Sequence, residues 1–196
     1  VIAMRERTPF PRSLLEQLPD LKHLVTTGAR NRSIDLAAAR DLGVLVTHTG
    51  SCGSPAAELA WAGMLAALRN IPAEVQNFRD GGPWQKGLGR SAEGKRLGIV
   101  GLGKLGDKCA RFGQVFGMDV VGWTRTDLPA RAGALGVMPL ALDALFATSD
   151  VVMIQLSLVP ETRGFVTPDL IGRMKRDALL VNTSRGPVVD EAALIA

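Results

Sequence analysis

The glycines at positions 101, 103 and 106 have the spacing of a loop that binds a pyrophosphate. They lie in Gly101-Leu102-Gly103-Lys104-Leu105-Gly106, after the strand-like run 97–100 and directly before a helical pattern. Gly101 permits the tight turn, Gly103 leaves room for a pyrophosphate to touch the backbone, and Gly106 lets helix and strand pack closely. The N–H groups of Lys104 and Leu105 would point at the phosphates, with the helix dipole behind them. This context predicts a dinucleotide site, and a glycine-rich turn without a ligand is the alternative.

The end of the following strand bears on which dinucleotide is bound. The strand-like run 119–123 leads into Thr124 and Arg125, where NAD-preferring sites usually carry an acidic residue. Arg125 can pair with a 2′-phosphate through charge-assisted hydrogen bonds, so the sequence favours NADP over NAD. Two alternatives stay open, because Arg125 can equally be a solvated loop arginine and Asp127 can serve as the ribose ligand.

Strand-like runs alternate with helical patterns along the chain. This alternation predicts an α/β fold, with a doubly wound parallel sheet of the Rossmann type over residues 54–196. Its expected strands are 97–101, 119–123, 150–156 and 178–183, with a weaker one at 136–138. Ligands in such sheets bind outside the carboxyl ends of the strands. We therefore expect four segments to converge on one crevice: 101–106, 124–125, 157–162 and 182–186.

The first 53 residues form a smaller α/β piece. Its expected strands are 24–27 and 44–47, and no opening strand is evident before them. Asp35 is placed to cap a helix that Gly43 would end. Ser54-Pro55 then starts a long helix that we expect to bend near Pro72 and to end around Phe78.

Further motifs give the chain a family resemblance. Together with the glycine loop, Pro160-Glu161-Thr162-Arg163-Gly164 and the run from Asn182 to Glu191 resemble the D-isomer-specific 2-hydroxyacid dehydrogenases. That family includes phosphoglycerate, glyoxylate/hydroxypyruvate and D-lactate dehydrogenases. The resemblance covers nearly the whole chain. It implies an oxidoreductase that transfers a hydride between NAD(P) and a small 2-hydroxy or 2-keto acid. It further implies a partial flavodoxin-like substrate domain at residues 1–53, a cytoplasmic location and a parent protein that is a homodimer.

The resemblance also assigns residues to roles. It gives Arg185 the place of the catalytic arginine, whose planar guanidinium binds the substrate carboxylate and polarises the carbonyl. The backbone near Ala29 and Arg30 matches the family's carboxylate-binding loop. Besides the three glycines, the implied cofactor contacts are Lys104, Leu105, Thr124, Arg125, Leu156, Thr162, Thr183 and Ser184. The sequence departs from the family at Gln155, Ser157 and Val159, where many members have His, Pro and Thr, and at Cys52, near a common asparagine.

One part of the expected chemistry is missing from the chain. Reduction of a 2-keto acid needs a proton donor with a pKa near neutrality, typically histidine. Family members supply a histidine, oriented by a glutamate, from segments downstream of the arginine motif. The two histidines here, His23 and His48, match neither that position nor a catalytic context. We therefore expect a chain truncated at both ends and inactive by itself, with the His–Glu pair outside it.

Two other functions compete with this interpretation. The same family resemblance extends to modules that sense NAD(P) without turnover, although a sensor would not need a substrate clamp at Arg185. A related enzyme acting on formate or phosphite is the other alternative. A turnover assay with glyoxylate or hydroxypyruvate separates the sensor from the dehydrogenase.

Composition narrows the remaining classes. The 23 Lys and Arg residues exceed the 19 Asp and Glu residues by only four and are scattered, so we expect no nucleic-acid partner. The longest apolar run, 59–68, is half of the roughly 20 residues that a membrane span needs. Cys52 and Cys109 lie in unrelated contexts, which predicts buried thiols in a reducing cytosol rather than a disulfide or a metal site.

Overall fold

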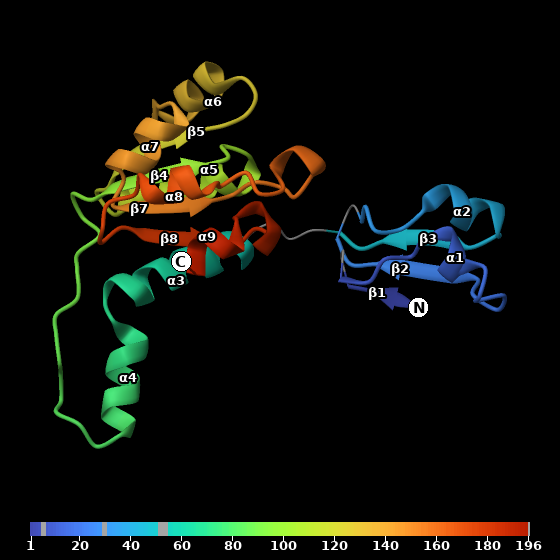
Figure 1. Ribbon diagram of the computed structural model, residues 1–196, viewed down its shortest axis with the longest axis horizontal. Coiled ribbons are helices and arrows are strands. Elements are labelled where there is room, and N and C mark those ends of the chain that lie inside the picture. Colours follow the sequence, from blue (N-terminus) through green and yellow to red (C-terminus); the bar gives the residue numbers. More distant parts are fainter. Residues whose placement is uncertain (5–6, 29–30, 51–54, 196) are drawn as a thin grey trace. The chain divides into compact units, whose positions relative to one another are not determined.

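The chain forms two compact units, residues 1–52 and 53–196. A computed structural model describes residues 1–4, 7–28, 31–50 and 55–195 (Figure 1). Each unit has its own parallel sheet and its own apolar core.

The first unit is a three-stranded parallel sheet in the order β1-β2-β3. Its elements are β1 (Ile2–Ala3), α1 (Arg12–Leu15), β2 (His23–Thr26), α2 (Leu36–Asp41) and β3 (Leu45–His48). The expected helix signals are confirmed, since the Asp35 carboxylate accepts a hydrogen bond from the Ala38 N–H at 2.8 Å and Gly43 adopts a φ of +71° beyond the helix end. The expectation that no strand precedes β2 and β3 is wrong. Ile2 and Ala3 pair with Val25 and Thr26, and a two-residue strand is too short to show periodicity.

The second unit is a five-stranded sheet with all strands parallel, in the order β6-β5-β4-β7-β8. The strands are β4 (Arg96–Val100), β5 (Asp119–Trp123), β6 (Met138–Pro139), β7 (Val151–Ile154) and β8 (Leu179–Asn182). The helices are α3 (Pro55–Leu68), α4 (Ile71–Arg79), α5 (Lys104–Val115), α6 (Leu128–Leu135), α7 (Leu142–Thr148), α8 (Pro168–Gly172) and α9 (Glu191–Ile195). Short 3-10 turns lie at Pro160–Thr162 and Gly186–Val188.

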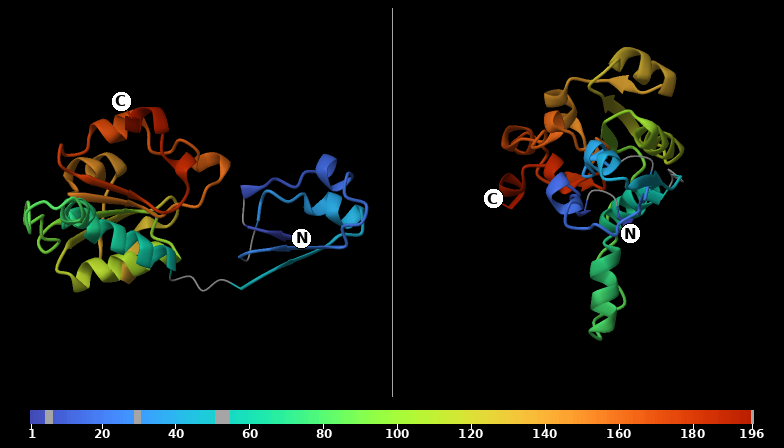
Figure 2. Two further views of the ribbon diagram at one scale, coloured as in Figure 1. Left: turned by 90° about the horizontal axis from the view of Figure 1, so that it is seen from below. Right: turned by 90° about the vertical axis from the view of Figure 1, so that its right-hand side faces the viewer.

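Both faces of this sheet are buried, which explains why its strands read as continuous apolar runs. Leu97 and Ile99 of β4 pack with α3 and α5, whereas Val152 and Ile154 of β7 pack with α7 and α8. Figure 2 shows α3 and α5 on one side of the sheet and α9 on the other. The free thiol of Cys109 lies inside the α3–α5 layer, as expected for a buried cysteine.

The strand order locates the ligand edge of the sheet. The chain runs outward from β4 through β5 to β6, then returns to the other side of β4 as β7 and continues to β8. The order therefore reverses between β4 and β7, which is the topological switch point of a doubly wound sheet. The predicted Rossmann-type α/β fold is confirmed.

The expected long helix is in fact two helices. Asn70 adopts the left-handed conformation with a φ of +55° and separates α3 from α4. The expected bend at Pro72 is therefore wrong. Pro72 lies in the first turn of α4, where its missing N–H leaves no hydrogen bond unmade.

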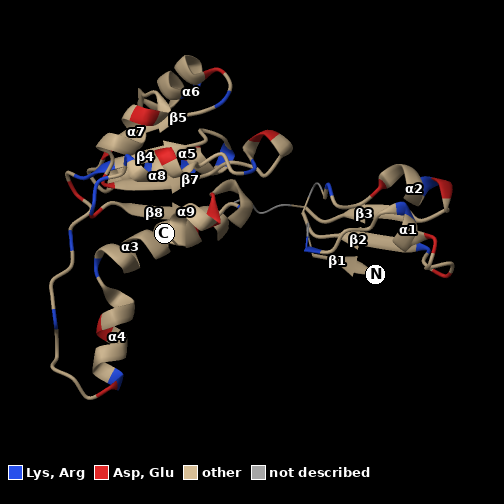
Figure 3. Ribbon diagram, viewed as in Figure 1, with Lys and Arg blue, Asp and Glu red and all other residues tan. Residues whose placement is uncertain are grey.

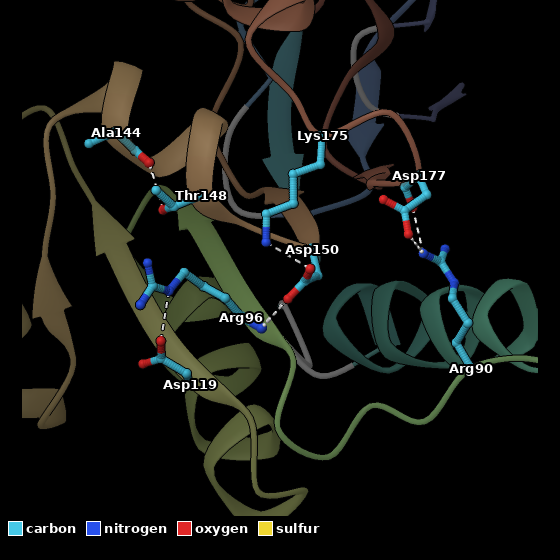
Figure 4. Close-up of polar contacts among 8 residues, drawn as sticks. All are labelled: Arg90, Arg96, Asp119, Ala144, Thr148, Asp150, Lys175 and Asp177. Atoms are coloured by element: carbon cyan, nitrogen blue, oxygen red, sulfur yellow. Dashed lines mark hydrogen bonds and ion pairs between the residues drawn. The ribbon is translucent and has the colours of Figure 1, made fainter.

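Acidic and basic residues are interspersed along both units (Figure 3). One group of them ties together the amino ends of three strands (Figure 4). The Asp150 carboxylate accepts hydrogen bonds from the Arg96 N–H and from Lys175 Nζ, each at 2.8 Å. The Arg96 guanidinium donates to Asp119 at 2.7 Å. Partial burial acts to raise the pKa of Asp150, but the bonds from Lys175 and the Arg96 amide outweigh it and hold that pKa below its ordinary value.

Asp150→Asn should lower the free energy of unfolding by about 1 kcal/mol at neutral pH, because it removes the charge from a partly exposed carboxylate that accepts two hydrogen bonds. A depressed folded-state pKa stabilises the protein above the unfolded pKa of about 4, and that stabilisation is lost as the pH falls through the folded value. Urea unfolding at neutral pH and near pH 3 should therefore show the difference from wild type shrinking in acid. Asp177→Asn is the control, since its exposed carboxylate pairs with Arg90. An equal difference at both pH values would contradict the assignment.

Candidate functional site

The turn at the carboxyl end of β4 requires glycine at position 101. Its φ is +111°, which side-chain-bearing residues rarely adopt, and a Cβ there would lie 2.7 Å from the carbonyl oxygen of Gln155. The Gly101 N–H donates to the Trp123 carbonyl at 2.7 Å. Gly101 thus holds the start of the loop against the ends of both neighbouring strands, β5 and β7.

The other two glycines meet different constraints. A Cβ on Gly106 would overlap the carbonyl oxygen of Gly101, so α5 and β4 can approach this closely only with glycine there. A Cβ on Gly103, at the N-terminal end of α5, would meet no atom within 4 Å. The loop is therefore tight at both ends and open in the middle, which fits a pyrophosphate approaching the backbone at Gly103.

The start of α5 supplies favourable electrostatics for such an anion. The helix has 12 residues, and its first N–H groups lack intrahelical partners. Lys104 is exposed in the first helical position, and Leu105 is half-buried. The first-turn acid, Asp107, forms an ion pair with Arg111 at 2.6 Å.

The loop after β5 and the glycine loop each make a side-chain contact with a neighbouring element. Thr124 is half-buried and Arg125 is exposed. Arg125 Nη1 lies 3.6 Å from Glu161 Oε2, and Arg131 of α6 donates to the Leu102 carbonyl at 3.1 Å. The sequence predicts that Arg125 and the segment 157–162, which contains Glu161, share one crevice. It predicts neither their ion pair nor the contact of Arg131, because no spacing along the chain indicates these contacts.

The loop after β7 is held by a buried threonine. The Thr162 hydroxyl accepts a hydrogen bond from the Val159 N–H at 2.8 Å and donates to the Ser157 carbonyl at 2.7 Å. Its side chain is thus engaged within the loop, and the residue is only 4% exposed. Leu156 packs partly buried against the apolar layer formed with α7 and α8.

Gln155 is an unusual residue at the switch point. Both polar atoms of its side chain are buried, and neither has a hydrogen-bond partner in the described part of the chain. Unsatisfied buried amides are rare because they forfeit their hydrogen bonds to water. This one follows β7 directly beside Gly101, where the sequence already departs from the family pattern.

The loop after β8 is organised by an asparagine that the sequence analysis did not single out. Asn182 Oδ1 accepts hydrogen bonds from the Ser184 N–H at 3.1 Å and from its hydroxyl at 2.7 Å, and Asn182 Nδ2 donates to the Arg185 carbonyl at 3.1 Å. Arg185 is half-buried and donates to the Ser184 carbonyl at 2.8 Å. Thr183 Oγ1 donates to the Ala56 carbonyl of α3 at 3.4 Å. An asparagine at a strand end is a known turn-former, which is the signal that could have found it.

The four predicted segments all follow carboxyl ends of strands in one parallel sheet. Ala29, Arg30 and Cys52 lie outside the described residues. Within the described ranges, no three His, Cys, Asp or Glu side chains gather as a metal site would require. Nor does any helix there have the length and apolar character needed to cross a membrane.

Comparison with known proteins decides the family. Residues 61–196 match the model of the D-isomer specific 2-hydroxyacid dehydrogenase, NAD binding domain. The chain belongs to the D-isomer specific 2-hydroxyacid dehydrogenases. The resemblance inferred from the motifs is thereby confirmed, and the residues that match the family's NAD-binding domain lie in the second unit.

Individual relatives agree with this family assignment. It is 36% identical over 196 residues to D-3-phosphoglycerate dehydrogenase of Mycobacterium tuberculosis, covering 98% of the chain and 37% of that protein. Glyoxylate reductase of Aeropyrum pernix is 35% identical over 192 residues, covering 93% and 57%. Phosphoglycerate oxidoreductase from Vibrio cholerae superimposes with a TM-score of 0.92 at 39% identity, covering 98% of this chain and 62% of that one. The chain thus spans less than two thirds of each of these proteins.

The three glycine constraints predict separable effects in this chain. Gly103→Val should weaken NADPH and NADH binding by about tenfold or more, because its side chain fills the open space, while changing stability by less than about 1 kcal/mol. Gly106→Ala should destabilise the fold by roughly 2 kcal/mol, because its methyl group overlaps backbone. Fluorescence titration and urea unfolding measure the two effects. Unchanged cofactor binding by Gly103→Val would show that the dinucleotide does not approach this loop.

Proposed function

We propose that this protein transfers a hydride between NAD(P) and C2 of a small 2-hydroxy or 2-keto acid. The observation that carries the proposal is the open space at Gly103, which lies at the N-terminus of α5 between two close backbone contacts. The bound nicotinamide would supply or accept the hydride. The residues of the chain bind it, orient it and hold the substrate.

The proposed cofactor residues follow the strand ends. The N–H groups of Lys104 and Leu105 face the pyrophosphate, and Thr124 and Arg125 face the adenosine ribose. The remaining contacts come from Leu156, Thr162, Thr183 and Ser184. Because the hydroxyls of Thr162 and Thr183 already bond to protein carbonyls, these two residues act mainly by fixing the shape of their loops.

Arg185 is the proposed substrate residue. Its guanidinium would bind the carboxylate and polarise the C2 carbonyl. Asn182 sets the turn that presents Arg185. The two histidines stand on β2 and β3 of the first unit. We place the proton donor, an imidazole oriented by a carboxylate, outside these 196 residues.

The 196-residue chain should bind NADPH yet not oxidise it with glyoxylate or hydroxypyruvate above the buffer rate, because the proton donor is absent. Fluorescence titration measures the binding, and loss of absorbance at the reduced-nicotinamide band measures turnover. Gly103→Val is the matched negative control for binding. If neither dinucleotide binds, the proposed function is wrong. If the chain turns over substrate, the placement of the proton donor is wrong. A complete protein that binds NADPH without turnover would be a sensor.

We further propose a preference for NADP over NAD. It is supported by Arg125, which follows β5 where an acidic residue would favour NAD, and by Arg131, whose guanidinium donates to the Leu102 carbonyl of the glycine loop. The proposed compartment is the cytosol, with which the free, buried thiol of Cys109 is compatible.

A homodimer is the proposed assembly, and it is supported by an ordered projection that we call the arm, residues 71–90. Figures 1 and 2 show α4 projecting away from its sheet. The Glu74 carboxylate accepts hydrogen bonds from the N–H groups of Lys86 and Gly87, and Asn77 Nδ2 donates to the Pro83 carbonyl at 2.6 Å. The arm therefore has fixed structure. Its exposed apolar side chains are Ile71, Val75, Phe78, Trp84 and Leu88. So much apolar surface on one element favours a second copy as partner.

Val75→Asp should convert the dimer into a monomer, because it places a charge in the middle of the apolar stripe on α4. Light scattering after size exclusion should give twice the mass of one chain for wild type and a single mass for the variant. Val115→Asp is the control, since Val115 is exposed at the end of α5, outside the arm. A monomeric wild type at all concentrations would contradict the proposal.

A further inference from the structure

Two side-chain contacts join the segments on either side of β4. In the sheet, β4 lies between β5 and β7. Arg125, just after β5, forms an ion pair with Glu161, in the segment after β7. Trp123, at the end of β5, packs on Phe165 with ring centroids 5.1 Å apart. Both contacts thus span the strand from which the glycine loop leads.

Glu161 is held in place on its side of this span. It lies in the 3-10 turn Pro160–Thr162, directly before the buried Thr162. The hydroxyl of Thr162 closes the loop through hydrogen bonds to Ser157 and Val159. The carboxylate is therefore presented by a fixed turn, and it forms an ion pair with the Arg125 guanidinium 3.6 Å away.

We propose that Glu161 is a specificity-determining residue that competes with the 2′-phosphate of NADP for Arg125. This inference rests on the proposed function, in which Arg125 faces the adenosine ribose. A 2′-phosphate carries up to two negative charges, so it must displace Glu161 from the guanidinium or share it at close range. The 2′-hydroxyl of NAD carries no charge and meets no such competition. The Glu161 carboxylate therefore reduces the preference for NADP over NAD that the Arg125 guanidinium creates.

The size of this effect follows from the exposure of the pair. The side chains of Arg125 and Glu161 are 52% and 65% exposed, so solvent and salt screen their attraction. Removing the carboxylate should change NADP affinity by about fivefold rather than by orders of magnitude. The change should be largest at low ionic strength.

The test is a double-mutant cycle in the 196-residue chain with Arg125→Gln, Glu161→Gln and both together. Dissociation constants for NADPH and NADH are measured by fluorescence titration at low and high salt. Glu161→Gln should tighten NADPH binding about fivefold and leave NADH nearly unchanged. In the Arg125→Gln background the same change should have a much smaller effect. Glu93→Gln removes an equal charge just before the amino end of β4, whereas the candidate site lies at the carboxyl ends of the strands. This control should alter neither dissociation constant.

The outcomes separate this inference from the proposed function. If wild type binds neither dinucleotide, the proposed function fails. If both bind and Glu161→Gln leaves their ratio unchanged, only the role of Glu161 is overturned. Weaker NADPH binding by Glu161→Gln would also overturn it, because the carboxylate would then be orienting Arg125 for the phosphate. An equal gain in the Arg125→Gln background would show direct repulsion instead of competition for the guanidinium.

Discussion

The close approach of α5 to β4 is the constraint on which the second unit depends. Gly106 lies against the carbonyl of Gly101, and that contact sets the angle at which α5 leaves the sheet. On the opposite face, a Cβ at Gly98 would overlap side-chain atoms of Ser149 and Leu145, so α7 packs on β4 just as closely. Helices therefore pack closely on both faces of the central strand, β4. The chain turns at the end of this strand through Gly101, which has a positive φ. The ligand loop is a consequence of how tightly the core is packed.

That packing also explains how distant segments come to share one edge of the sheet. All strands of the sheet are parallel, so their carboxyl ends lie along the same edge. The loops after β4, β5, β7 and β8 therefore converge because of the strand direction alone. The opposite edge is pinned independently, through Asp150 and its bonds to Arg96 and Lys175. The charges around Asp150 and the charges of the candidate site thus occupy opposite ends of the same strands. Substitutions at one end can alter stability with little effect on the site.

The sequence predicted the parts of the site whose signals are local. Glycine loops, apolar runs and the Asp35 cap each express a constraint between near neighbours, and the fold class follows from their alternation. The sequence predicts that the helix bends at Pro72, because proline is the more familiar sequence signal for a helix break. The chain instead turns at Asn70, which adopts a left-handed conformation. The roles of Asn182 and Glu161 depend on which atoms meet after the strands assemble. The burial of the Gln155 side-chain amide likewise could not be predicted, because it depends on how the neighbouring loop packs.

Arg125 shows that the net charge a side chain presents to a ligand depends on its neighbours as well as on its type. Considered along the sequence, it is a cation at the position where NADP enzymes need one. In the folded chain, that cation already has a carboxylate on the far side of β4 as its neighbour. A guanidinium that is fully neutralised would discriminate little between NAD and NADP, whereas one with no partner would discriminate strongly. A weak, exposed pair lies between these limits, because its attraction is small enough for a doubly charged phosphate to overcome. Cofactor preference in such a site is thus a property of the pair.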